Sequence, residues 1–130
     1  MLKAIREVLP GAKLQRCLVH IQRDCRIWLT NRPKSSAGYD LKQITSKIHL
    51  INSHYELSLW LLNLNKWHQE YREYINQKSY NLETERYWYT HKMVRRSFMT
   101  IKRALPNMFY YLDNPKIPKS TILLNLFLVI

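Results

Sequence analysis

A stripe of apolar residues that recurs every three or four positions between residues 54 and 77 constrains the fold more than any other feature of this sequence. This period matches one face of an α-helix and predicts a long amphipathic helix. The chain has only two glycines in 130 residues, which disfavours an all-β fold built on many tight turns. We therefore expect a mainly α-helical protein. The stripe consists of Leu57, Trp60, Leu61, Leu64, Trp67, Tyr71, Tyr74 and Ile75.

Helical periods and turn residues divide the rest of the chain. Pro10 and Gly11 should end a first helix, Asp40 should cap a middle one, and Pro106 should end the last. Residues 14–19 are predicted to form one short strand. A single strand cannot make a sheet, so its partners are expected to lie outside this chain. The expected helices cover residues 2–9, 20–29, 41–51, 54–77 and 82–105.

The charge balance points to a polyanionic partner. Lys and Arg number 21 against 9 Asp and Glu, which gives a net charge of +12. Basic side chains that neutralise phosphates release condensed counterions, so an excess of this size favours nucleic-acid binding. Each of the nine acids is expected to be solvated or paired with a nearby cation, and no catalytic residue is assigned.

The segment RYWYTHKMVRRS, residues 86–97, interleaves aromatic side chains with cations. Trp88 and Tyr89 are expected to stack on an unpaired base, while the cations follow phosphates. The alternative is a half-buried helix whose aromatic residues belong to the core. The expected DNA-binding residues are Arg86, Trp88, Tyr89, Lys92, Arg95, Arg96, Lys102 and Arg103.

The stretch QRCLVH places Cys17 three residues before His20. These two side chains are candidates for half of a zinc site or for a Cys–His nucleophile. The alternative is that Cys17 packs in the core and His20 makes a fixed hydrogen bond. A zinc site needs further ligands, and the candidates are Cys25, His49, His54, His68 and His91.

LKAIREVLPGAKLQRCLVHIQRD, YWYTHKMVRRS and ALPNMFYYLDNPKIPKST together resemble bacterial insertion-sequence transposases of the mutator-related type. The resemblance implies a ribonuclease-H-like core with three metal-binding acids. The family's R-C-x-x-H strand is matched by Arg16, Cys17 and His20, which implies that His20 supports the active site and that Cys17 packs beneath it. It also implies three parts: a core fragment over 1–32, a helical insertion over 33–113, and an altered apolar tail over 114–130.

The departures from the family concern its acids. The family's first two acids would precede Met1, and Thr121 is followed by ILLNLFLVI instead of the Asn-x-x-Glu pattern. Two-metal phosphoryl transfer needs carboxylates to hold the cations. The resemblance therefore implies an incomplete core that uses no cofactor and does not cleave DNA alone, whereas an intact member would use Mg²⁺.

Three functions follow as expectations. The first is a truncated transposase fragment in the bacterial cytoplasm, associated with the nucleoid, that retains DNA binding. The second is a basic helical regulator that inhibits an intact transposase, and the third is a small zinc-binding module. The expected partners are DNA and either a second copy of the chain or an intact transposase. No membrane association is expected.

Overall fold

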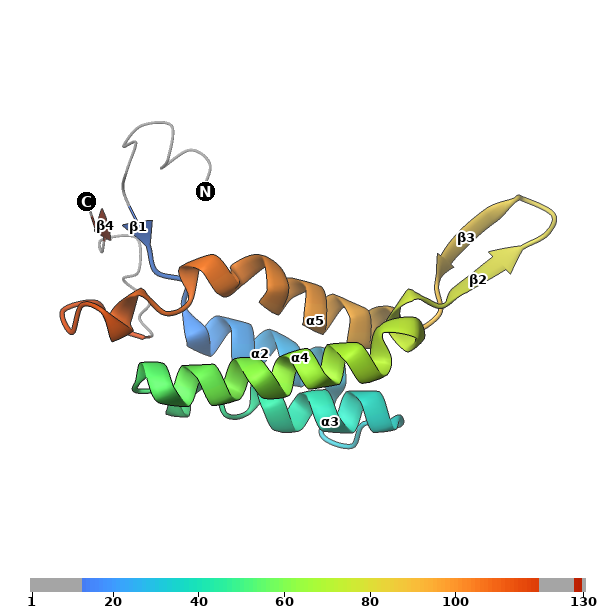
Figure 1. The fold of residues 1–130 in the computed structure, drawn as a ribbon. Coiled ribbons are helices and arrows are strands. Elements are labelled where there is room, and N and C mark those ends of the chain that lie inside the picture. The colour runs from blue at the N-terminus through green and yellow to red at the C-terminus, as the bar shows by residue number, and fades with distance from the viewer. Residues whose placement is uncertain (1–12, 120–127, 130) are drawn as a thin grey trace.

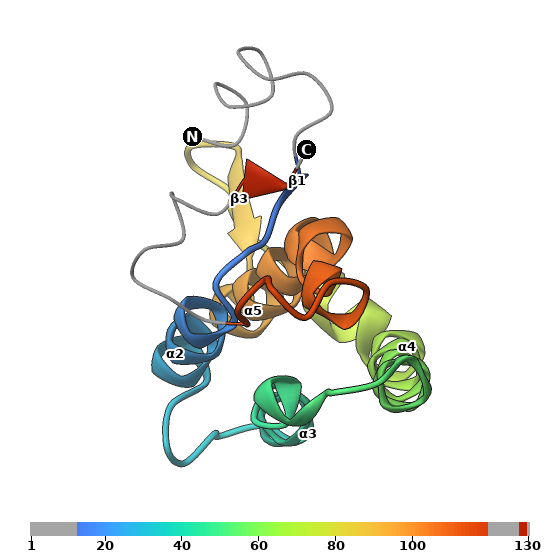
Figure 2. The same cartoon turned by 90° about the vertical axis from the view of Figure 1, so that its left-hand side faces the viewer.

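The computed structural model describes residues 13–119 and 128–129, and within them the protein is mainly helical. Four α-helices run alternately up and down and enclose one core (Figure 1). Seen almost end-on, α3 lies between α2 and α4, and α5 lies across from α3 (Figure 2). The helices are α2 (Leu18–Leu29), α3 (Ser36–Thr45), α4 (His54–Asn76) and α5 (Lys92–Ala104).

Short elements connect and flank the helices. One 3₁₀ turn follows α3 and two follow α5. A β-hairpin joins α4 to α5 and projects beyond the end of the bundle (Figure 1). The predicted helix over 2–9 and most of the tail lie outside the described residues. The short elements are β1 (Lys13–Leu14), η1 (Ile48–Leu50), β2 (Lys78–Asn81), β3 (Arg86–Tyr89), η2 (Leu105–Asn107), η3 (Tyr110–Leu112) and β4 (Leu128–Val129).

Helix α4 confirms the prediction made from the apolar stripe. Ser53 caps the helix by accepting a hydrogen bond from the backbone N–H of Glu56 at 3.1 Å, and its hydroxyl donates to the Glu56 carboxylate at 3.1 Å. The first bond satisfies an N–H group that the start of the helix would otherwise leave unpaired, and it explains why the helix begins where it does. From the stripe, Trp60, Leu64 and Trp67 are among the buried side chains.

The predicted helix over 41–51 is wrong in its position and in its cap. The helix begins at Ser36, and Ser35 caps it by accepting from the N–H of Gly38 at 3.0 Å. Asp40 lies inside the helix and accepts a hydrogen bond from the Tyr71 hydroxyl at 2.7 Å. The serine competes successfully because it precedes the first helical residue and its short hydroxyl reaches the free N–H groups.

The predicted strand over 14–19 is also corrected. Only Lys13 and Leu14 are in a strand, which pairs antiparallel with β4 of the same chain. The Gln15 side chain is buried and donates to the Met108 carbonyl, and the Arg16 N–H donates to the Asn107 carbonyl at 2.7 Å. These bonds hold the chain against η2 instead of extending the strand, and α2 begins directly afterwards.

The largest error concerns residues 82–91, which are not helical. The Asn81 side chain accepts from the N–H groups of Glu83 and Thr84 at 2.9 and 3.3 Å, which closes a turn between β2 and β3. Consecutive aromatic residues favour the extended strand that follows. The apolar period that predicted a helix is genuine only from residue 92 onward, in α5.

Glu85 in this turn has a φ of 58°, where a side chain is sterically strained. Replacing Glu85 with glycine should therefore stabilise the hairpin by about 0.5–1 kcal/mol. Hydrogen exchange of the amides in the β2–β3 ladder should slow by about two- to fivefold, while exchange in α4 stays unchanged. Faster exchange in the ladder would contradict the role assigned to this residue.

The core is built from all four helices. The ribonuclease-H-like assignment and the three-part division stay predictions, although helices on both sides of residue 32 share this core. Among the described residues, the buried side chains that form this cluster are Leu18, Ile21, Cys25, Leu29, Ala37, Leu41, Ile48, Ile51, Trp60, Leu64, Trp67, Ile75, Phe98, Ile101, Ala104, Met108, Tyr111 and Ile117.

Candidate nucleic-acid interface

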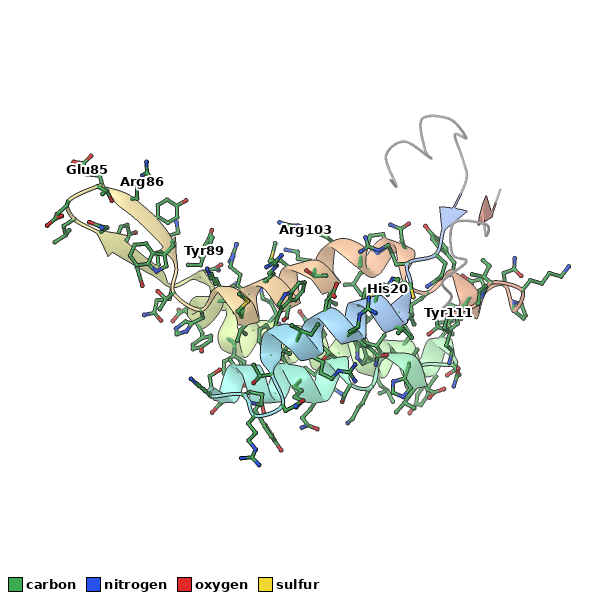
Figure 3. All side chains as sticks on the ribbon, turned by 180° about the vertical axis from the view of Figure 1, so that it is seen from behind. His20, Glu85, Arg86, Tyr89, Arg103 and Tyr111 are labelled. Atoms are coloured by element: carbon green, nitrogen blue, oxygen red, sulfur yellow. The ribbon has the colours of Figure 1, made fainter. Side chains whose placement is uncertain are left out.

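The eight predicted DNA-binding residues lie on two elements instead of one helix. Three are on β3 and five are on α5, and they spread along the length of the molecule (Figure 3). Arg86 lies far out on the hairpin, Tyr89 lies at its base, and Arg103 lies well along α5 (Figure 3). The predicted helix over 82–105, which would have carried all eight residues, is therefore wrong before residue 92.

The hairpin separates the two aromatic residues that were expected to act together. Trp88 pairs with Ser79 across the ladder, and Tyr89 pairs with Lys78. Side chains of consecutive strand residues point to opposite faces, so Trp88 and Tyr89 cannot stack on the same base. Trp88 is 49% exposed on its own face of the hairpin. Its role in DNA binding stays a prediction, now without Tyr89 beside it.

A surface hollow of about 510 Å³ is lined by five of the eight predicted residues, namely Tyr89, Lys92, Arg95, Arg96 and Arg103. We call it the basic hollow. Four cations line it and no acidic residue does, so the potential inside it is positive. The lining residues are Trp28, Tyr89, Lys92, Met93, Arg95, Arg96, Met99, Thr100 and Arg103.

The sequence of α5 explains why these cations share one face. Phe98, Ile101 and Ala104 are buried against the bundle. Residues 92, 96, 99 and 103 are three, four or seven positions apart and lie on a different side of the helix. Lys102 lies apart from the basic hollow and lines a second hollow with His68 and Phe98. Burial, followed by the charge of Lys102, lowers the pKa of His68.

Arg95 has a structural role in the basic hollow, where its guanidinium contacts both the hairpin and α4. Its guanidinium carbon lies 3.7 Å from the centre of the Tyr89 ring. The same group donates to the carbonyl of Ile75 at 3.3 Å and to the side chain of Asn76. A cation here binds a carbonyl that the end of α4 would otherwise leave unpaired. Arg95 therefore ties the hairpin base to α4, and its donors are partly occupied.

Trp28 is a residue of this site that sequence reasoning placed elsewhere. The helical period of residues 20–29 predicts that Trp28 shares a buried face with Ile21, Cys25 and Leu29. Those three are buried, whereas Trp28 is half-buried at the edge of that face, and the guanidinium carbon of Arg96 lies 4.7 Å from the centre of its ring. No local signal reveals this pairing, because it depends on how α2 packs against α5.

The residues of the R-C-x-x-H match have different environments. Cys17 is buried and immediately precedes α2, with extended backbone angles. Arg16 is half-buried, and His20 is exposed on the first turn of α2 (Figure 3). The structure thus agrees with Cys17 packing in the interior, while a supporting role of His20 in an active site stays a prediction.

The described part of the chain contains no candidate metal site. Among residues 13–119 and 128–129, no three His, Cys, Asp or Glu side chains gather where they could hold a metal ion. Cys17 and Cys25 are both buried and are not in a disulfide. Burial raises the pKa of the Cys25 thiol to about 12, so this thiol is neutral at physiological pH and a poor nucleophile.

Comparisons with known proteins identify no family for this chain. No family model, no curated protein and no solved structure matches it. Within the part of the chain that the structure describes, no helix combines the length and the apolar character needed to cross a membrane. The observation that bears most on function is therefore the acid-free group of cations around the basic hollow.

Proposed function

We propose that this protein binds double-stranded DNA through the basic hollow, by contacts to backbone phosphates. The observation that carries the proposal is the set of four cations that line one hollow without an acidic neighbour. The net charge of +12 favours the same class of partner. The resemblance of the sequence motifs to mutator-related transposases supports the same proposal, because those proteins act on DNA.

The spacing along α5 suits a run of phosphates. Lys92, Arg96 and Arg103 lie on one side of the helix and span eleven residues, which is about 16 Å at the rise of an α-helix. One strand of duplex DNA carries about one phosphate per 3.4 Å of axis, so this distance covers four or five phosphates. These contacts carry no sequence information, and binding is expected to be nonspecific.

Replacing Lys92, Arg96 and Arg103 together with glutamine tests the proposal. Affinity for a short labelled duplex of random sequence should fall roughly tenfold or more at low salt. The slope of log K against log salt should shrink by about 2–3, because about one counterion is released per phosphate contact. Fluorescence anisotropy between about 50 and 200 mM salt measures both quantities.

A matched control removes the same charge elsewhere. Arg32, Lys47 and Lys66 are exposed outside the basic hollow, and Lys47 and Lys66 line another hollow that also contains Asp40 and Glu70. Their replacement by glutamine should leave the salt slope close to that of the parent protein. Equal losses in the two triple variants would mean that only net charge matters, and the basic hollow would then not be the site.

A further inference from the structure

Trp28 lies outside the core cluster and contacts a cation of the basic hollow. It is half-buried, and it belongs neither to the buried core cluster nor to the partly buried residues that pack against that cluster. The guanidinium carbon of Arg96 lies over the Trp28 ring, 4.7 Å from its centre. A cation at this distance from an indole ring is attracted by the negative face of the ring.

We infer that Trp28 is a positioning residue of the DNA site, which holds the Arg96 guanidinium in the orientation that binds a backbone phosphate. This inference rests on the proposed function. The two residues come from different helices, so their contact exists only because α2 packs against α5. The chemical group recognised is a phosphodiester of the duplex.

The donors of Arg96 are available for such a contact. Within residues 13–119 and 128–129, neither a hydrogen bond nor an ion pair engages its guanidinium, whereas Arg95 is bonded to Ile75 and Asn76. A guanidinium stacked on an aromatic ring keeps its N–H groups pointing outward in its plane, where they match two phosphate oxygens. Among the described residues of the basic hollow, Arg96 thus combines a contact with an aromatic ring and N–H donors that can bind a phosphate.

The contact with Trp28 lowers the entropic cost of binding a phosphate with Arg96. A free arginine side chain loses rotamer freedom when it binds a phosphate, and an arginine already held on a ring loses less. Because the guanidinium carbon lies over the Trp28 ring, this side of the ring is not free to stack on a base, and the pair is suited to a phosphate. Binding should therefore depend on Trp28 only when Arg96 is present.

A double-mutant cycle tests this dependence with Trp28→Leu, Arg96→Gln and the combined variant. The duplex described above is the probe, and its affinity is measured at one low salt concentration. Arg96→Gln should weaken binding by about tenfold. Trp28→Leu should weaken it by about two- to fivefold in the parent protein and not at all in the Arg96→Gln background. Replacing Arg96 with lysine should not restore the coupling, because an ammonium lacks the planar fork.

The outcomes separate this inference from the proposed function. If Arg96→Gln leaves affinity unchanged, the basic hollow is not the DNA site. If Arg96→Gln weakens binding but Trp28→Leu costs nothing, or costs the same in both backgrounds, then Trp28 does not position Arg96. A matched cycle with Trp88→Leu should show no coupling to Arg96. Thermal unfolding should show every variant folded, because neither Trp28 nor Arg96 belongs to the core.

Discussion

Replacing Trp67 with alanine should lower the free energy of unfolding by about 3–5 kcal/mol, the cost of removing a buried aromatic side chain. Trp67 is 3% exposed, and its ring centre lies 5.3 Å from that of Phe98 on α5. Its Nε1 donates to the carbonyl of Ala37 on α3 at 2.9 Å. The variant therefore loses contacts with two other helices and the side-chain hydrogen bond to Ala37.

Urea unfolding followed by circular dichroism measures this loss. Trp88→Ala is the matched control, because Trp88 is 49% exposed and its loss should cost less than about 1 kcal/mol. Trp67→Phe should fall between the two, since it keeps a ring but not the hydrogen bond to Ala37. A Trp67→Ala variant as stable as the control would show that α3, α4 and α5 do not meet at this residue as described.

Alkaline pH should destabilise the protein through Cys25. Burial, followed by the negative charge of Asp24, raises the pKa of this thiol from its ordinary value of 9.0 to about 12, and a hydrogen bond with Ser97 partly opposes this shift. The folded state therefore keeps the thiol protonated where the unfolded state releases the proton. The stabilisation is complete below pH 9 and is lost as the pH rises from 9 towards 12, by about 1.4 kcal/mol per pH unit.

Comparison with Cys25→Ala isolates this effect. The alanine variant has no thiol to titrate. The stability of the parent protein relative to Cys25→Ala should therefore be constant below pH 9 and should fall by about 1.4 kcal/mol per pH unit above it. Urea titrations from pH 8 upward, with a reductant present, provide the measurement. Burial and the charge of Glu56 raise the pKa of Tyr111 to about 12 in both proteins, and its contribution cancels. Parallel curves for the two proteins would contradict the raised thiol pKa.

The helices that are amphipathic over their whole length could be predicted from sequence. The stripe from Leu57 to Ile75 gave α4 to within one residue, and the period around Ile21 and Cys25 gave α2 to within two. In both segments the local period and the tertiary packing favour the same structure. Where several local signals competed, as with Ser35 against Asp40, the prediction placed the helix several residues away from its position.

Residues 78–91 show why the rest could not be predicted. Tyr87, His91 and Val94 fit a helical period, and only the turn closed by the Asn81 side chain and the pairing of β2 with β3 exclude it. This error changed the candidate site, because consecutive residues of a strand face opposite sides and Trp88 therefore points away from Tyr89. The error concerned the arrangement of these residues in space, and their role in DNA binding stays a prediction.

The sequence by itself determined that this protein is mainly helical, strongly basic and rich in cations along α5, because period and charge are properties of local segments. Only the tertiary structure decided which cations share a surface. Packing of α2 against α5 brought Trp28 to Arg96, although 68 positions separate them in the chain. The end of α4 engaged Arg95 and left Arg96 available. Contacts between distant segments depend on the closure of the whole bundle, and no local pattern encodes them.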